Sequence, residues 1–173
     1  MRVDFSTIAI PPHPPLPSIA TIPQGSGITS HTDGSCVGNP GPAGSSVVLS
    51  QGGRLIGAQG FQIGIATNNV AELMGAVHTL RWAHGRSDLR LIIVTDSEYL
   101  RNGITTWIAT WRRNGWRTST GQPVSNKDVW EELHARTTAF PFLRWQWTRG
   151  HVGNEFNEVA DIMAGLAARG RIG

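Results

Sequence analysis

The sequence has very little cysteine and lysine, and no long apolar run. Its one cysteine, Cys36, excludes an internal disulfide and a zinc site built from several cysteines. The longest uninterrupted apolar stretch, Leu91 to Val94, is far shorter than the roughly 20 residues that a membrane-spanning helix needs. No basic and then apolar leader opens the chain, so we expect no secretion. These features predict a soluble, cytoplasmic protein that does not associate with membranes.

The positive charge comes almost entirely from arginine. Lys127 is the sole lysine among 15 basic residues, and 12 acidic residues leave a formal net charge of +3. The planar fork of arginine suits phosphate recognition. A genome-wide bias toward arginine explains this composition at least as well, so the charge alone does not identify a partner.

The chain divides into a proline-rich tail and one domain. Its 173 residues fit a single domain with a sizeable core and a short appendage. Residues 1–27 contain the run Pro11 to Pro17, and proline fixes its backbone angle and lacks an amide donor. We expect this tail to be extended and disordered or loosely attached. It is either a docking peptide for an unknown partner or a variable leader.

Residues 28–170 change repeatedly between strand-like and helix-like patterns. Three strands are expected first, at 28–33, 45–50 and 54–63, with a glycine- and proline-rich loop at 34–44. The elements expected after them are a helix at 68–84, a strand at 89–95, a helix at 97–113 broken near Gly103, a helix at 126–138, a strand at 143–148 and a helix at 154–168. This order predicts an α/β fold with a mixed sheet covered by helices.

Four acidic residues stand at positions where a carboxylate needs an explanation. Asp33 and Asp96 each close a strand, at the sheet end where functional groups gather in open α/β sheets. Glu72 and Asp161 lie among apolar residues of the first and last helices, where an unpaired charge is costly to bury. Taken singly, the two strand-end aspartates are better explained as helix caps, and the two helical residues as surface ion pairs.

A cluster of these four carboxylates would need a cation. Like charges in one place raise each other's pKa values and repel one another unless divalent ions neutralise them. Hard oxygen ligands without sulphur or a histidine pair suit magnesium or manganese and argue against zinc. The spacing of the residues does not itself establish that the four meet in space.

Four motifs, in order, resemble those of bacterial-type ribonuclease HI, the type 1 ribonuclease H family. They are TDGSCVGNPG at 32–41, TNNVAEL at 67–73, TDSEY at 95–99 and GHVGNE at 150–155, continuing to Asp161. The match extends over nearly everything outside the tail. The resemblance implies a ribonuclease H-like fold with a five-stranded mixed sheet flanked by helices and a basic handle. It also implies a monomer whose substrate is the RNA–DNA hybrid duplex.

The resemblance assigns a role to each member of the catalytic set. Asp33 would bridge two magnesium ions, with Asp161 holding the ion that binds the attacking water. Glu72 and Asp96 would hold the ion beside the leaving oxygen, and manganese would be able to replace magnesium. Such an endonuclease hydrolyses the RNA strand and leaves 5′-phosphate and 3′-hydroxyl ends. His151, with an unperturbed pKa near 6.5, would assist proton movement or product release.

The same resemblance places further residues along the substrate. Cys36, Asn39, Asn68 and Asn69 would lie along the minor groove of the hybrid, where the 2′-hydroxyl distinguishes RNA from DNA. Thr67 and Asn126 match positions that hold a phosphate of the DNA strand. Glu98 stands where bacterial relatives often have a substrate-contacting glutamine, so this chain has an additional carboxylate beside the metal ligands.

The stretch from Arg101 to Arg117 resembles the basic handle of the family. It has no acidic residue, and its expected substrate contacts are Arg112, Arg113, Trp116 and Arg117. Arginines there would meet phosphates of the DNA strand, giving an affinity that falls as salt rises. Five of the seven tryptophans lie between Trp107 and Trp145. We expect them mainly to pack the handle and core, because the bases of a duplex are already stacked.

Three other functions compete with this interpretation. A transposase, integrase or Holliday-junction resolvase also uses clustered carboxylates, but the handle and the Asn68-Asn69 pair argue against these enzymes. A non-catalytic nucleic-acid-binding module would be expected to lack a metal ligand, and none is missing here. An adaptor role of the proline-rich tail is compatible with catalysis.

Overall fold

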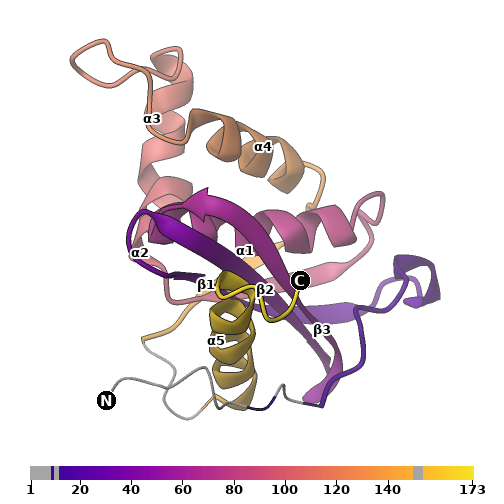
Figure 1. Cartoon of the computed structure of the whole chain (residues 1–173). Coiled ribbons are helices and arrows are strands. Elements are labelled where there is room, and N and C mark those ends of the chain that lie inside the picture. The colour runs from indigo at the N-terminus through magenta and orange to yellow at the C-terminus, as the bar shows by residue number, and fades with distance from the viewer. Residues whose placement is uncertain (1–8, 10–11, 150–153) are drawn as a thin grey trace.

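A five-stranded mixed sheet forms the centre of the structure, a computed structural model that describes residue 9, residues 12–149 and residues 154–173 (Figure 1). The strands are β1 (Gly27–Cys36), β2 (Gly41–Gln51), β3 (Arg54–Ala66), β4 (Arg90–Thr95) and β5 (Arg144–Trp147). Their order in the sheet is β3-β2-β1-β4-β5. The first three strands pair antiparallel, whereas β4 pairs parallel with both β1 and β5. The expected mixed sheet is confirmed.

Helices cover both faces of this sheet. On one face lies α1 (Asn68–Trp82), with α4 (Lys127–Thr137) packed against it. On the other face α5 (Glu155–Ala168) crosses β1, β2 and β3 (Figure 1). Successive side chains of a strand point to opposite faces, and β1 accordingly contacts α1 through Ser30 and α5 through His31. Within the described residues, no helix has the length and apolar character needed to cross a membrane.

The first two strands are longer than expected. The sequence predicted a loop at 34–44, but β1 continues to Cys36 and β2 begins at Gly41, which leaves only residues 37–40 as a loop. The pairs Ser35–Gly44 and Cys36–Ala43 extend the ladder through this glycine-rich stretch. Small residues are tolerated in the ladder when the neighbouring strand satisfies their backbone groups, so the composition here was misleading.

The helical segment after β4 is broken by packing at one glycine. It consists of α2 (Glu98–Asn102), a π-helical turn (Gly103–Trp107) and α3 (Ile108–Arg113). A Cβ atom at Gly103 would overlap the ring of Trp130, which is fully buried. The predicted break near Gly103 is therefore confirmed, and its cause is the close approach of this indole.

The aromatic side chains of this region pack on one another. The rings of Trp107 and Trp111 have centroids 5.7 Å apart, and those of Trp111 and Trp116 are 6.0 Å apart. Trp111 also meets Trp130 edge-on at 5.5 Å. The prediction that these tryptophans serve packing is confirmed. They attach α3 and the following loop to the core, and this handle projects away from the sheet (Figure 1).

Residues 12–26 lie against the domain and form a strap over it. The amide of Ala58 in β3 donates to the carbonyl oxygen of Pro14 at 2.9 Å. Nε1 of Trp82 donates to the carbonyl of Pro17 at 2.8 Å, and Nη1 of Arg86 donates to the carbonyls of Ile19 and Ile22. The expectation of a loosely attached tail is wrong for this part, because backbone and side-chain donors of the domain satisfy carbonyls of the proline-rich backbone. Residues 1–8 and 10–11 lie outside the described part.

Candidate metal centre

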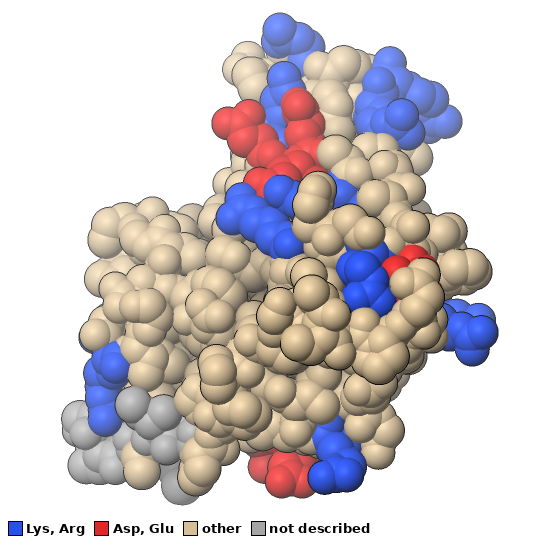
Figure 2. All heavy atoms as spheres, turned by 90° about the vertical axis from the view of Figure 1, so that its right-hand side faces the viewer, with Lys and Arg blue, Asp and Glu red and all other residues tan. Residues whose placement is uncertain are grey.

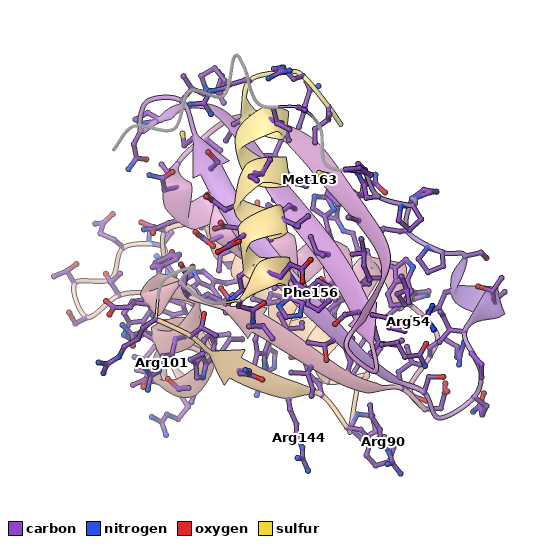
Figure 3. All side chains as sticks on the ribbon, turned by 90° about the horizontal axis from the view of Figure 1, so that it is seen from below. Arg54, Arg90, Arg101, Arg144, Phe156 and Met163 are labelled. Carbon is purple, nitrogen blue, oxygen red and sulfur yellow. The ribbon has the colours of Figure 1, made fainter. Side chains whose placement is uncertain are left out.

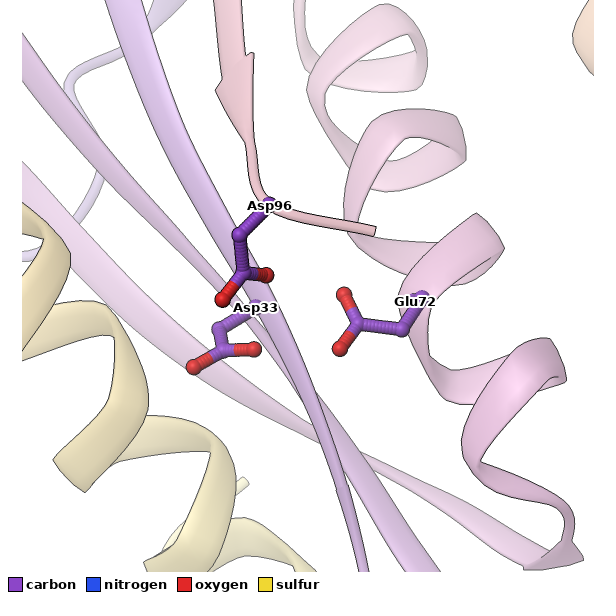
Figure 4. Close-up of side chains that lie close together, drawn as sticks. All are labelled: Asp33, Glu72 and Asp96. Carbon is purple, nitrogen blue, oxygen red and sulfur yellow. The ribbon is translucent and has the colours of Figure 1, made fainter. Parts of the chain in front are cut away.

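Three carboxylates converge where β1 and β4 end (Figure 4). Asp33 belongs to β1, Asp96 directly follows β4, and Glu72 reaches them from α1. One oxygen atom from each carboxylate lies within 4.8 Å of the others. Since β1 and β4 are parallel neighbours, their carboxyl ends meet at one edge of the sheet. This arrangement explains why two aspartates that are distant in sequence share a site.

Gly34 determines how closely Glu72 approaches Asp33. A Cβ atom at this position would overlap the backbone of Ala71 and Glu72, so only glycine allows α1 to lie this close to β1. The start of α1 is fixed by two further contacts. The hydroxyl of Thr67 accepts from the amide of Val70 at 3.3 Å, and Oδ1 of Asn39 accepts from the amide of Asn68 at 3.1 Å. These contacts place Glu72, one turn after the start of α1, in the cleft.

Glu72 is a strongly perturbed group of the cluster. Burial raises its pKa well above the usual value, and the charges of Asp33 and Asp96 raise it further. Its Oε2 atom is buried and accepts no hydrogen bond from any residue that the structure describes. A divalent cation would remove both costs, because it neutralises the repulsion and supplies a ligand contact to the unpartnered oxygen. The all-oxygen donor set fits a hard cation.

Asp161 completes the acidic set from the opposite helix layer. It lies on α5 and lines, with the other three carboxylates, a cleft of about 560 Å³. Asn68, Asn69 and Glu98 line the same cleft. The structure thus brings together all four carboxylates that the sequence singled out, although Asp161 is outside the tight group of three.

A buried contact between β1 and α5 positions Asp161. His31 and Asp33 point to the same face of β1, and Asn157 and Asp161 are one turn apart on α5. The two pairs face each other, and His31 Nδ1 lies 2.8 Å from Asn157 Oδ1. Burial lowers the pKa of His31, so we assign the neutral ring's proton to Nδ1, which donates to Asn157. Nε2 then accepts from the hydroxyl of Ser50 at 3.4 Å.

Comparison with known proteins decides the family. The model of the RNase H family, described as "RNase H", matches residues 25–169. The chain belongs to the RNase H family.

Its relatives include proteins named "Ribonuclease H" from two bacteria. The one from Treponema pallidum is 44% identical over 154 residues, covering 82% of this chain and 90% of the relative. The one from Maricaulis maris is 44% identical over 147 residues, covering 83% of this chain and 97% of the relative. The resemblance read from the four motifs is confirmed, and the chain is an enzyme of the ribonuclease H type.

Two solved structures of RNase H1 proteins are similar to this RNase H. LC9-RNase H1, a type 1 RNase H with the type 2 active-site motif, has a TM-score of 0.74 at 28% identity, over 87% of this chain and 75% of that chain. RNase H1 from the archaeon Halobacterium salinarum has a TM-score of 0.58 at 27% identity, over 83% of this chain and 98% of that chain. Both agree with the observed sheet and flanking helices.

Several substrate residues expected of an RNase H have structural contacts in this chain. The thiol of Cys36 donates to the carbonyl of Ala66 at 3.1 Å, Thr67 caps α1, and Asn39 holds the amide of Asn68. Nδ2 of Asn126 donates to the hydroxyl of Tyr99 at 3.1 Å. These four residues therefore stabilise the loops around the cleft, whatever contacts they make with substrate.

The handle residues are not brought to the acidic cleft. Arg112, Arg113 and Arg117 are exposed on α3 and the loop after it, and Trp116 is half-buried there. Figure 2 shows basic side chains gathered at this end of the molecule, with acidic side chains beside them. Arg117 also donates to the carbonyl of Gly121 at 2.9 Å. His151 lies outside the described residues.

Sequence reasoning missed His31 and Asn157. Both could have been found from their spacing once the strand and the helix are predicted. His31 stands two residues before Asp33 in a strand, and Asn157 stands four residues before Asp161 in a helix. Either spacing places a polar side chain beside a carboxylate of the acidic cleft on the same face. Only the packing of α5 on β1 shows that the two polar residues bond to each other.

Proposed function

We propose that this RNase H hydrolyses the RNA strand of RNA–DNA hybrids as an endonuclease, using two divalent metal ions. One observation carries the proposal: the three carboxylates of Asp33, Glu72 and Asp96 meet within 4.8 Å, with a buried oxygen of Glu72 left unpartnered by the described residues. Asp161 lines the same cleft. Such a donor set, in a chain of this family, supports metal-dependent phosphodiester hydrolysis that leaves 5′-phosphate and 3′-hydroxyl ends.

Each carboxylate has a proposed share in holding the ions. Asp33 lies between α1 and α5 and would hold both ions, with Asp161 beside the attacking water and Glu72 and Asp96 beside the leaving oxygen. When bound, divalent ions supply a water of lowered pKa and positive charge for the leaving oxygen. Magnesium is the proposed ion and manganese its substitute, because every ligand is a hard oxygen. His151 is proposed to move a proton or assist product release.

The substrate contacts are proposed in two groups. Asn68, Asn69 and Glu98 line the acidic cleft, and with Cys36 and Asn39 they would follow the minor groove and test for a 2′-hydroxyl. The second group would bind phosphates of the DNA strand and comprises Thr67, Asn126, Arg112, Arg113, Trp116 and Arg117. The four handle residues do not line the acidic cleft, and phosphate contacts made there would give an affinity that falls as salt rises.

A substrate panel tests the proposal. Labelled RNA–DNA hybrid, double-stranded RNA and double-stranded DNA are incubated with the protein in magnesium or in chelator. We expect cleavage of the RNA strand of the hybrid only, in magnesium only, and kinase labelling should report 5′-phosphate products. Cleavage of the DNA duplex, as by an integrase or resolvase, or cleavage of hybrid in chelator would contradict the proposal.

A further inference from the structure

A second cleft, of about 370 Å³, opens beside the metal centre. Asp96, Ser97 and Glu98 line both clefts, so the two are continuous. The remainder of the second cleft is lined by Arg101 of α2 and by residues 147–149 at the end of β5. The cleft therefore lies where a strand that passes over the carboxylates would leave them.

Two guanidinium groups reach this cleft from different elements. Arg101 and Arg149 are both exposed, and neither forms an ion pair with a carboxylate in the described part of the chain. Arg81, Arg86 and Arg136, by contrast, each pair with an acidic residue. An arginine that makes no ion pair keeps its planar set of donors available for an anion, and phosphate matches that geometry.

The second cleft is also lined by a hydroxyl group and by an aromatic ring, those of Thr148 and Trp147. Oγ1 of Thr148 is buried and has no hydrogen-bond partner among the described residues. Trp147 is half-buried and stacks on Trp145, with ring centroids 5.7 Å apart. Guanidinium groups and a hydroxyl suit an acceptor-rich ligand with negative charge. Glu98, which is exposed, lines both this cleft and the acidic cleft.

We propose that Arg101 and Arg149 bind a backbone phosphate of the RNA strand next to the phosphate that is cut. This inference rests on the proposed function, which brings the RNA strand to the carboxylates. The cleft is continuous with the metal centre, so its occupant is the strand that is cleaved and not the complementary DNA strand. Contacts to phosphate fix register without reading bases, and the two arginines would thus position the scissile bond.

Arg90 and Arg144 provide a matched control. They lie at the beginnings of β4 and β5, whereas Arg101 and Arg149 lie beyond the ends of the same strands. Figure 3 shows Arg90 and Arg144 beside each other and away from Arg101. The double variants R101Q/R149Q and R90Q/R144Q therefore remove equal charge from opposite edges of the sheet, and all four side chains are exposed.

The first measurement is hybrid binding in chelator at several salt concentrations. For R101Q/R149Q, the slope of log affinity against log salt should become shallower by about 1, the change expected when one phosphate contact is lost. Affinity should fall roughly tenfold at low salt, and R90Q/R144Q should keep the slope of the wild type. Equal slopes for the two double variants would overturn the proposal, with thermal unfolding used to verify that both variants are folded.

The second measurement locates the phosphate. Hybrids carrying one uncharged methylphosphonate at successive RNA positions are cleaved by wild type and by R101Q/R149Q. Wild type should lose kcat/KM at one position beside the cut, and the variant should show no further loss there. The inference alone would be overturned if R101Q/R149Q were as sensitive as wild type to a methylphosphonate at every RNA position. It would also be overturned if the variant lost sensitivity only to a methylphosphonate in the DNA strand. Failure of wild type to cleave the unmodified hybrid would overturn the proposed function as well.

Discussion

Glu72 is where the stability of this enzyme and its proposed chemistry are in conflict. The pKa of Glu72 is higher in the folded protein than in the unfolded chain. Ionising Glu72 therefore costs no stability below its unfolded pKa, and the free energy of unfolding decreases as pH rises from there toward neutrality. The metal-free protein therefore carries repulsion at pH 7 among Asp33, Glu72 and Asp96. Sites prepared for a cation commonly sacrifice stability in this way.

Replacing Glu72 by glutamine should stabilise the metal-free protein. Glu72→Gln keeps the shape of the side chain but removes its charge, and we expect an unfolding temperature about 2–4 °C higher, corresponding to ~1 kcal/mol. Magnesium or manganese should raise the unfolding temperature of wild type and have little effect on the variant. Thermal unfolding in chelator and in metal measures both effects. Glu131→Gln, in an exposed ion pair with Lys127, is the control, and a variant no more stable than wild type would refute the explanation.

His78 should make the protein sensitive to mild acid. Burial, together with the charge of Arg81, lowers its pKa to about 4, and its ring stacks on Phe61 with centroids 3.8 Å apart. The unfolded chain binds a proton near pH 6.5 while the folded one does not, so stability falls as pH drops from about 6.5 to about 4. We expect urea unfolding to show a smaller fall for His78→Phe. His84→Gln, at an exposed site, is the control and should lose as much stability as wild type over this pH range. A loss for His78→Phe as large as that of wild type or of the control would count against this explanation.

The packing of α5 on β1 decides where Asp161 lies. The His31–Asn157 hydrogen bond joins these elements, and one turn further along α5 Asp161 lines the same cleft as Asp33. A second contact holds α5 on the sheet, because the hydroxyl of Ser46 in β2 donates to the carbonyl of Ala160 at 2.6 Å. The position of the Asp161 carboxylate thus depends on a buried polar pair outside the cleft.

Breaking this pair should weaken metal binding without weakening hybrid binding. His31→Phe and Asn157→Ala should each lower divalent-ion affinity in calorimetry several-fold, and the double variant should lose little more, because either change already removes the bond. KM for hybrid should be unchanged while kcat falls. Gln62→Ala, which breaks the bond from β3 to Ile172, is the control. Additive losses in the double variant would show that the two residues act independently.

Much of this arrangement of elements could be predicted from the sequence. Alternating patterns gave the strands, and apolar spacing gave the helices to within a few residues. The loop at 34–44 was misjudged because glycine and proline composition does not reveal that Ser35 and Cys36 pair with β2. The break at Gly103 was predicted as a position, while its cause, the ring of Trp130, depends on residues far along the chain.

At the scale of the whole molecule, the strap of residues 12–26 joins β3, α1 and the segment before β4. Its carbonyls accept from Ala58, Trp82 and Arg86, and Ile22 is buried. None of its residues lines the acidic cleft or the second cleft, which Arg101 and Arg149 line. The strap should therefore contribute to stability and not to chemistry.

Removing the strap should lower the free energy of unfolding and spare activity. Deletion of residues 1–26 should cost roughly 4 kcal/mol, since four of the hydrogen bonds that Ala58, Trp82 and Arg86 donate to the strap contribute about 1 kcal/mol each. The kcat at low temperature should remain that of the full chain. Trp82→Phe, which loses one of these bonds, should cost about 1 kcal/mol in the same urea titration. A deletion variant as stable as the full chain would show that the strap is not part of the folded unit.

The sites differ in how far the sequence reveals them. The four carboxylates could be predicted because each lies within a recognisable motif, and motif order gave their relation. Arg101 and Arg149 could not, because the sequence places one in the stretch assigned to the handle and the other before the histidine loop. Their approach to one cleft follows from the parallel pairing of β4 and β5.

The central claim is that the carboxylate cluster performs metal-dependent cleavage of hybrid. Asp33→Asn tests it most directly, because Asp33 belongs to the group of three carboxylates that meet within 4.8 Å, and the change replaces one oxygen by nitrogen. Hybrid binding in chelator and cleavage in magnesium are measured on the same preparation, beside wild type. We predict near wild-type binding, an unchanged fold and no detectable cleavage for the variant. Cleavage by Asp33→Asn at a rate close to that of wild type would contradict the account.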